Sequence, residues 1–265
     1  MAPPSAIKPF PAMHRTLTFH TLAGFPHIKP GDDLARQIAD CLAANDLTLQ
    51  PGDVVALAQK VISKAEGRYR RLADVVPGRE ADDWARRTGK DPRLVQVTLD
   101  EANHVLRFRP NLLVVEHRLG MVMANAGIDQ SNIDGAGEQV LLLPEDPDRS
   151  AEALAGALER LTGVRPAVLI TDSVGRAWRI GTCGIAIGAA GIRSVDDIRG
   201  EADMMGRELK VSIVGHADQL AAAACVATGE GAEGTPAVLI RGLPVEPAPL
   251  PAAALVRPAV DDMFR

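Results

Sequence analysis

The sequence predicts an α+β fold in which mixed sheets and helices occur together. Short apolar runs bounded by glycine or proline predict strands, and segments with apolar residues at helical spacing predict helices. The two kinds of segment do not alternate in a strict β-α-β order, which favours α+β over a doubly wound sheet. Hydrophobic residues make up 46% and charged residues 24% of the 265 residues, a globular composition with enough apolar side chains for a sizeable core.

The first half of the chain is expected to begin with a strand over 16–22 and a turn at 24–26. A helix over 34–44 follows, and Asp32 or Asp33 is its expected N-cap. The next expected elements are a buried strand over 53–58, helices over 79–88 and 92–102, strands over 105–108, 112–115 and 121–124, a polar loop over 125–137 and a strand over 140–143.

In the second half, Ser150 is expected to cap a helix that ends at Leu161, and a buried strand over 167–171 follows. The glycine-rich stretch 175–200 is expected to be irregular except for a strand near 185–187. The remaining expected elements are a strand over 211–214, a helix over 217–227, a loop over 229–234 and a strand over 237–240.

Proline-rich segments set the expected domain limits. Residues 1–15 read as an N-terminal arm, and residues 244–265 read as a Pro/Ala-rich tail whose prolines oppose regular structure until the last turn. Between them, residues 16–243 form the expected catalytic region, as one unit or two subdomains.

Charge and hydropathy narrow the class of protein. The net charge of -5 argues against a nucleic-acid partner, because neutralising phosphates needs a basic surface. No apolar run approaches the roughly 20 residues that span a bilayer, and the first residues lack the apolar core of a signal peptide. Cys41, Cys183 and Cys225 fit neither a disulfide framework nor a zinc spacing. A cytoplasmic location without a membrane partner is therefore expected.

Polar loops beside apolar strands are the candidate sites, because a rigid scaffold holds such loops in place. In the loop 58–68, Lys60 and Lys64 could meet anions, although from this segment alone two solvated surface lysines are the favoured explanation. In the loop 124–132, Asp129 suits a hard cation and Asn132 suits a phosphate or a ribose. The alternative there is a turn in which both side chains bond only their own backbone.

The third segment, 169–181, begins in a buried strand that runs directly into Asp172 and Ser173. A carboxylate beside a hydroxyl is a frequent Mg²⁺ arrangement. Arg176 and Arg179 follow, and their paired donors could hold phosphate or carboxylate. We favour this interpretation over an aspartate helix cap beside exposed arginines.

The fourth loop, 228–236, is rich in glycine and contains Glu230 and Glu233. Its backbone N–H groups could approach phosphates closely, and the glutamates could add oxygen ligands. The loop does not match the P-loop pattern, and a flexible surface loop is the alternative explanation.

Nine stretches of the chain resemble one known family. They are GDDLA, AQKVISKAEGR, KDPR, ANAGIDQSN, LLLPEDPDRSA, TDSVGRAWRIG, AIGAAGI, RGEAD with GREL, and GEGAEGTPAVLIRG. They run in the family's order from about Gly24 to Gly242. The family is that of the coenzyme F420-0:L-glutamate ligases of deazaflavin cofactor biosynthesis.

The resemblance implies an unusual α+β fold and an intertwined homodimer. It also implies a reaction that joins L-glutamate to the lactyl carboxylate of F420-0 and can add further γ-linked glutamates. GTP is the implied co-substrate, with two Mg²⁺ or Mn²⁺ ions per site and K⁺ as a further activator.

Site residues follow from the same resemblance. Asp129 and Asp172 would hold one metal ion, and Ser173 and Glu230 would help to hold a second. Many members have threonine where this chain has Ser173, and the hydroxyl is kept. The implied GTP contacts are Phe25, Pro26, His27, Ile28, Gln59, Lys60, Lys64, Asn132, Thr228, Gly229, Glu230, Gly231, Ala232, Glu233, Gly234 and Thr235.

The resemblance suggests an acyl-phosphate mechanism in which Lys64 offsets phosphate charge. Arg176 and Arg179 would hold either substrate carboxylates or the phosphate of F420-0, and the sequence does not separate these roles. A metal-dependent nucleotide phosphotransferase or hydrolase acting on another small carboxylate needs the same carboxylates and is the alternative function. A nucleotide-binding module without catalysis is disfavoured, because it needs fewer carboxylates beside its phosphate loop.

Overall fold

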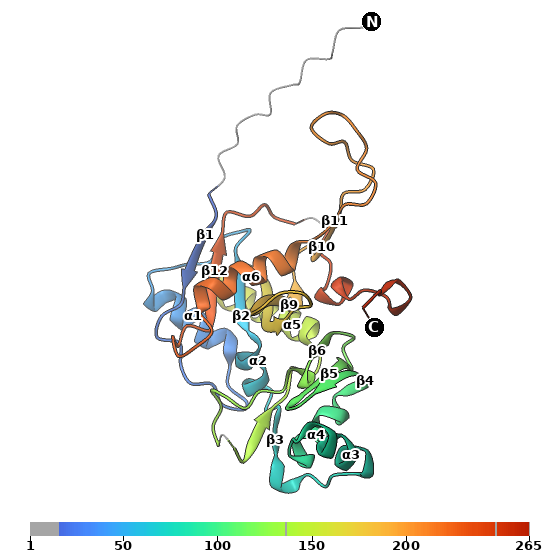
Figure 1. The fold of residues 1–265 in the computed structure, drawn as a ribbon. Coiled ribbons are helices and arrows are strands. Elements are labelled where there is room, and N and C mark those ends of the chain that lie inside the picture. Colours follow the sequence, from blue (N-terminus) through green and yellow to red (C-terminus); the bar gives the residue numbers. More distant parts are fainter. Residues whose placement is uncertain (1–15, 136, 247, 265) are drawn as a thin grey trace, which may run out of the picture.

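A computed structural model describes residues 16–135, 137–246 and 248–264. The expected N-terminal arm, 1–15, lies outside the described residues. The mixed α+β class is confirmed, since several separate sheets are combined with helices (Figure 1).

A five-stranded sheet forms the centre of the larger part of the molecule. Only β2 and β8 pair in parallel; the other neighbours in this sheet are antiparallel. The strands, in spatial order, are β1 (Thr18–Thr21), β12 (Ala237–Arg241), β2 (Val54–Ala58), β8 (Ala167–Gly175) and β9 (Thr182–Ala190).

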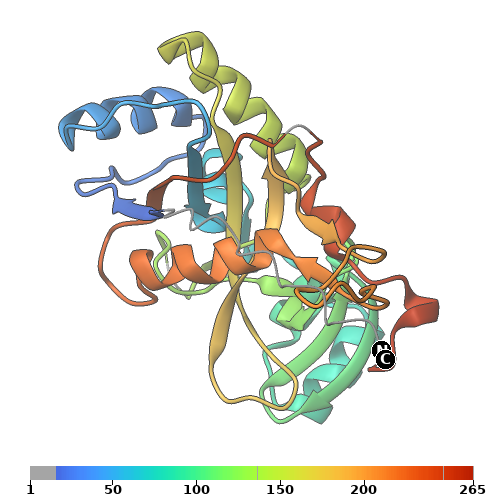
Figure 2. The ribbon, with the colours of Figure 1, turned by 90° about the horizontal axis from the view of Figure 1, so that it is seen from above.

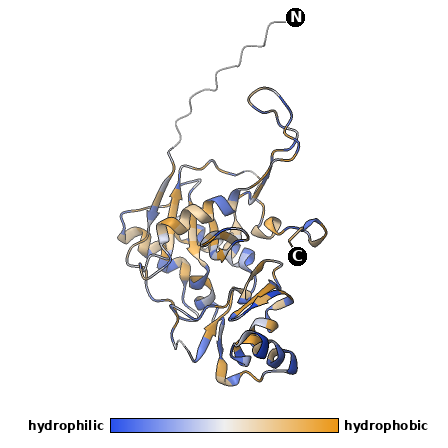
Figure 3. Ribbon diagram, viewed as in Figure 1, coloured by the Kyte–Doolittle hydropathy of each residue, from blue (hydrophilic) through white to orange (hydrophobic). Residues whose placement is uncertain are grey.

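Helices cover both faces of this sheet (Figure 2). α1 (Leu34–Ala44) and α5 (Pro147–Thr162) pack on one face, and α6 (His216–Thr228) packs on the other. Successive side chains of β2 face opposite sides of the sheet, and both sides are buried, so every residue of the strand is apolar. Its residues Val55 and Leu57 face the core under α1 and α5, while Val54 and Ala56 face the core under α6. β2 and β12 are accordingly coloured as hydrophobic in Figure 3.

A smaller group of elements, coloured from cyan to yellow-green in Figure 1, packs around a core of its own. Its strands form a three-stranded antiparallel sheet in the order β4-β5-β6. β3 and β7 pair beside it. The elements are β3 (Tyr69–Arg71), α3 (Arg79–Thr88), α4 (Pro92–Asp100), β4 (Ala102–Arg109), β5 (Leu112–His117), β6 (Val122–Ala124) and β7 (Gln139–Leu141).

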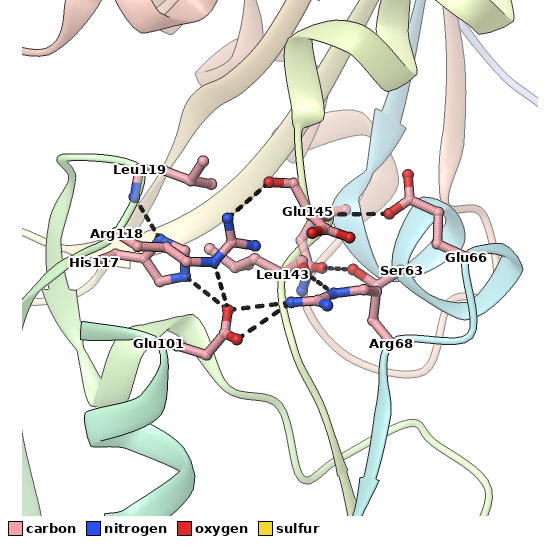
Figure 4. Close-up of polar contacts among 10 residues, drawn as sticks. Ser63, Glu66, Arg68, Glu101, His117, Arg118, Leu119, Leu143 and Glu145 are labelled. Carbon is pink, nitrogen blue, oxygen red and sulfur yellow. Dashed lines mark hydrogen bonds and ion pairs between the residues drawn. The ribbon is translucent and has the colours of Figure 1, made fainter. Parts of the chain in front are cut away.

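An ionic cluster around Glu101 ties the smaller group to the larger one (Figure 4). The Glu101 carboxylate accepts hydrogen bonds from Arg68 at 3.2 Å and from Arg118 at 3.1 Å. Arg68 also donates to the Leu143 carbonyl at 2.9 Å. Burial alone would raise the pKa of Glu101. Hydrogen bonds from His117 and Arg118, with the positive charges of Arg118 and Arg68, outweigh that effect and lower the pKa to about 2.

We expect Glu101→Gln to lower the free energy of unfolding by about 2 to 4 kcal/mol at pH 7, because it leaves two guanidinium groups without their carboxylate. The pKa of Glu101 is lower in the folded than in the unfolded chain, so its contribution exists above the unfolded value of 4.5 and is lost as the pH falls toward about 2. Urea unfolding of both proteins from pH 7 to pH 3 tests this. A difference that stays constant below pH 4.5 would contradict it.

Several expected elements need correction. Asp146, not Ser150, caps α5, and its carboxylate accepts the Arg149 N–H; the helix therefore begins at Pro147 and Ser150 lies inside it. Of the two candidate caps for α1, Asp33 is the one used. The helix expected to reach residue 102 ends at Asp100.

The stretch expected to be irregular between 175 and 200 contains the nine-residue strand β9 and the short strand β10 (Val195–Asp197). β10 pairs with β11 (Ile213–Gly215), so the strand expected at 211–214 begins two residues later. Glycine and alanine dominate β9, which is why its composition reads as a loop. Pairing with β8 along its whole length stabilises it as a strand.

The C-terminal tail contains two short 3-10 helices, Ala252–Leu255 and Ala259–Asp261, instead of being irregular until its last turn. The Asp148 carboxylate fixes the first of them by accepting the backbone N–H groups of Ala252 at 2.8 Å and Ala253 at 3.1 Å. The tail is thereby attached to the start of α5. Within the described residues, none of the helices has the length and apolar character needed to cross a bilayer.

Candidate active site

The site forms where β2 and β8 end side by side. Their parallel register places Ala58 opposite Thr171. The residues that follow, Gln59 and Lys60 on one strand and Asp172 on the other, therefore come together although more than a hundred positions separate them in the chain.

The segment expected to be a loop at 58–68 is mostly helix: α2 covers Gln59–Ala65. No side chain caps its N-terminus, and it has only two turns, so the usual start signal is absent. Lys60 and Lys64 are four residues apart and consequently lie on the same side of α2. Gln59 and Ser63 share a second, buried side.

The strand expected to end at Thr171 continues as far as Gly175, so Asp172 and Ser173 lie within β8. Asp172 pairs with Ile185, and Ser173 pairs with Gly184. Successive strand residues face opposite sides of a sheet, so these two side chains point away from each other.

Asp129 is held by two residues of α2. Gln59 Nε2 donates to Asp129 Oδ2 at 2.5 Å, and Lys60 Nζ lies 2.9 Å from Asp129 Oδ1. A backbone pair between Asp129 and Leu141 fixes the main chain, with N–H···O distances of 2.9 and 3.0 Å. Asp129 is therefore a fixed carboxylate rather than a side chain that bonds only its own turn.

Two carboxylates interact at the centre of the site. Burial raises the pKa of Asp172, and the nearby charge of Asp129 raises it further, to about 7. Burial also raises the pKa of Asp129, although Lys60 opposes that shift. Both ionised forms are thus disfavoured in the protein alone, and an added cation would relieve that cost.

On the other side of β8, Ser173 meets the glycine-rich loop. Its hydroxyl donates to Glu230 Oε1 at 2.6 Å. The charge of Glu230 also contributes to the raised pKa of Asp172. Ser173 and Glu230, which are far apart in the sequence, are therefore brought together beside the Asp129–Asp172 pair.

The loop after α6 has a fold that depends on glycine. Gly229 has φ +74° and ψ 174°, a conformation essentially restricted to glycine. A Cβ built there would lie 2.4 Å from the Glu233 carboxylate carbon. That carboxylate accepts the Gly231 N–H at 2.8 Å, and Thr235 closes the loop by donating to the Thr228 carbonyl at 3.2 Å. The Glu233 side chain therefore stabilises the conformation of this loop.

Lys64 joins the remaining loop to the site. Its ammonium group donates to the Asn132 carbonyl at 2.7 Å, and the Asn132 side chain donates to the Gly231 carbonyl at 3.3 Å. Burial lowers the pKa of Lys64, and the charge of Asp134 opposes that shift. Lys64 and Asn132 thus connect α2, the 125–138 loop and the glycine-rich loop.

The other expected site residues, in the described part of the chain, lie outside this network of hydrogen bonds. Arg176 and Arg179 are exposed in the turn between β8 and β9, and no partner is recorded for them within the described part of the chain. In the stretch 25–28, Ile28 is buried, Phe25 is half-buried, and Pro26 and His27 are exposed. The stretch lies near α2, because the Gly31 N–H donates to the Ala65 carbonyl at 2.8 Å.

The donor set fits a cation that is shared with phosphate. Across the ranges that the structure describes, no group of three or more His, Cys, Asp or Glu side chains is placed to hold a metal ion by itself. Mg²⁺ is usually bound by one or two carboxylates together with substrate phosphates and water, rather than by a cage of protein ligands. Asp129 and Asp172 supply such a pair, and the Lys60 ammonium partly balances their charge.

A cavity of about 660 Å³ borders β9, the strand that pairs with β8. It runs past Ile185, the strand partner of Asp172, which shares its face of the sheet. The other walls include Met121 and Val122 of the β5–β6 region and Leu255 of the tail. No local pattern in the sequence predicts this cavity, because several distant segments form it and the tail was expected to be irregular.

The family model for F420-0:gamma-glutamyl ligase matches residues 24–242. A coenzyme F420:L-glutamate ligase of Methanopyrus kandleri is 47% identical over 242 residues, which cover 90% of this chain and 93% of that protein. The protein of the same name from Methanothermobacter thermautotrophicus is 42% identical over 251 residues, covering 91% and 96% of the two chains. That from Archaeoglobus fulgidus is 46% identical over 222 residues, covering 84% and 86%. The chain belongs to the F420-0:gamma-glutamyl ligase family.

Proposed function

We propose that this protein is a ligase that uses GTP and a divalent metal to add L-glutamate to coenzyme F420-0, with further γ-linked glutamates as a possible extension of the same reaction. One observation supports this above all. The half-buried carboxylates Asp129 and Asp172 lie together where β2 and β8 end, with Lys60 and Lys64 beside them. That arrangement suits a metal–triphosphate group.

The reaction proposed has two steps. A carboxylate oxygen of the acceptor attacks the γ-phosphorus of GTP, the bond to the β-phosphate oxygen breaks, and GDP leaves. The glutamate amine, having lost a proton, then attacks the acyl carbon of the acyl phosphate, and inorganic phosphate leaves as the amide forms. The first step brings two anions together, so neutralising charge is the main task of the site.

Two divalent cations, when bound, would supply much of that neutralisation and polarise the transferred phosphoryl group. Asp129 and Asp172 would hold one, and Ser173 and Glu230 would help to hold the other. Lys64 would offset the remaining phosphate charge. The backbone N–H groups of 228–235 would approach the phosphates, as the conformation of Gly229 permits. Arg176 and Arg179 would have to move inward with the β8–β9 turn to hold a substrate anion.

The cavity is the proposed binding site of the acceptor. Its size lies within the roughly 300 to 1,000 Å³ that is usual for small-molecule sites, and Ile185, the strand partner of Asp172, is one of the residues that line it. Its walls are mainly apolar, which suits a planar ring, whereas the triphosphate would face the lysines of α2.

A bulky residue at the wall of the cavity tests this placement. We expect Val122→Trp to raise the KM for F420-0 by about tenfold or more, because the indole would fill space that the acceptor needs, while the KM for GTP stays unchanged. Val226→Trp, on the exposed side of α6 outside the cavity, is the matched control. Equal acceptor KM values for the two variants would place the acceptor elsewhere.

A homodimer is also part of the proposal. The turn between β8 and β9 exposes the large apolar side chains of Trp178 and Ile180, which is unusual for a surface that meets only water. Sedimentation equilibrium of the wild type and of Trp178→Ser tests it. A protein that is monomeric at all accessible concentrations would exclude this part of the proposal.

Product analysis tests the function itself. The protein is incubated with F420-0, L-glutamate, GTP and Mn²⁺, and the product is weighed by mass spectrometry. A product heavier by one glutamate residue, formed together with GDP, is expected. A stable phosphorylated acceptor or GTP hydrolysis alone would instead identify the alternative, a metal-dependent phosphotransferase or hydrolase.

A further inference from the structure

Behind Asp129 lies a pair of buried polar residues that the proposed chemistry does not use. Gln59 is 1% exposed and Ser63 is 0% exposed. They are one turn apart on α2, and Ser63 Oγ donates to Gln59 Oε1 at 2.8 Å. Gln59 Nε2 in turn donates to Asp129 Oδ2.

The order of these hydrogen bonds is fixed by chemistry. An ionised carboxylate can only accept, so the amide group of Gln59 must present its nitrogen to Asp129. Its oxygen then points into the core and needs a donor, which the Ser63 hydroxyl provides. Without that hydroxyl, the buried amide oxygen would lose its hydrogen-bond donor. The amide could then rotate and place its oxygen against the carboxylate of Asp129.

Lys60 is a less rigid support for Asp129. It binds the other oxygen, Oδ1, and its side chain is 30% exposed. A flexible ammonium group can leave when a cation arrives, whereas the packed amide of Gln59 keeps its hold on Oδ2. Gln59 therefore sets the direction in which Asp129 offers Oδ1.

We infer that Ser63 is a positioning residue which, through the side-chain amide of Gln59, orients Asp129 for the divalent cation. This rests on the proposed metal site. It also gives the side chain of Gln59 a role other than direct contact with GTP. Residues that orient metal ligands typically change metal affinity by about 10- to 100-fold when they are removed.

Metal binding measured without turnover tests the inference. Mn²⁺ is titrated into the full-length protein in the presence of a non-hydrolysable GTP analogue, and free Mn²⁺ is read by electron paramagnetic resonance against a titration of the analogue alone. We expect Ser63→Ala to raise the Kd for Mn²⁺ by about tenfold or more. Ser194→Ala is the matched control, because Ser194 is also 0% exposed and also donates one hydrogen bond, to the Leu250 carbonyl at 2.8 Å. Its Kd should equal that of the wild type.

A double-mutant cycle separates positioning from a general loss of structure. Gln59→Met keeps the length of the side chain and removes the amide, so it should also weaken Mn²⁺ binding. Adding Ser63→Ala to Gln59→Met should then have no further effect on the Kd, because Ser63 acts only through the amide.

The outcomes are distinct. Wild-type affinity in Ser63→Ala, or equal effects of Ser63→Ala with and without Gln59, would overturn this inference alone. A wild-type protein that binds no Mn²⁺ would overturn the proposed metal site and the inference with it. If Ser63→Ala does not fold, Gln59→Met with wild-type affinity would equally overturn the role of the pair.

Discussion

Asp172→Ala is expected to reduce GTP-dependent glutamate ligation by about 10³-fold or more, because a principal metal ligand at a phosphoryl-transfer site contributes several kcal/mol to the transition state. Asp172 is also the carboxylate whose pKa is raised to about 7 by burial and by Asp129.

The fold should survive this change. Because the pKa of Asp172 is higher in the folded than in the unfolded chain, its ionisation lowers stability as the pH rises from about 4 through 7. Without metal, the variant should therefore be at least as stable as the wild type at pH 8. Initial rates with saturating GTP and Mn²⁺ measure the activity, and Asp197→Ala, at an exposed Asp–Arg pair, is the control. Near-wild-type turnover at limiting Mn²⁺ would refute the role of Asp172.

Lys64→Ala is expected to weaken GTP binding by about 10- to 100-fold, since hydrogen bonds to charged groups are worth about 1.5 to 3 kcal/mol. The ammonium group of Lys64 already lies at the junction of α2 with two loops, bonded to the Asn132 carbonyl. Burial lowers its pKa, so a phosphate group would favour its charged form.

Isothermal titration calorimetry with a non-hydrolysable GTP analogue measures this effect. Lys90→Ala is a close control. Lys90 also donates to a backbone carbonyl, that of Asn111 at 3.4 Å, and burial also lowers its pKa. It lies in the smaller group of elements, away from the site. Equal affinities of the two variants would show that Lys64 does not contact the nucleotide.

Much of the fold could be predicted from local pattern. The strands of the central sheet are short apolar runs, and α1 and α6 have apolar residues at helical spacing, so their positions agree to within a few residues. The failures share a physical cause. α2 lacks a capping side chain, and β9 is made largely of glycine and alanine. Each is stabilised by tertiary packing that local propensity does not reveal.

The sequence allows the residues of the candidate site to be proposed, but not their arrangement in space. The family motifs indicate Asp129, Asp172 and Glu230, but no local pattern reveals the parallel pairing of β2 and β8, which brings Asp172 close to the α2 residues that hold Asp129. Ser63 gave no signal either. A serine inside an apolar run is usually structural, and its relation to Asp129 depends on the amide of Gln59, which only the packed structure places.

A crystal structure with Mn²⁺ and a non-hydrolysable GTP analogue tests the central claim most directly. The manganese positions can be read from anomalous scattering. The account predicts manganese bound by Asp129 and Asp172 at the end of the triphosphate, with Ser173 and Glu230 beside a second ion. Manganese located elsewhere, with these side chains unchanged and the triphosphate far from them, would contradict it.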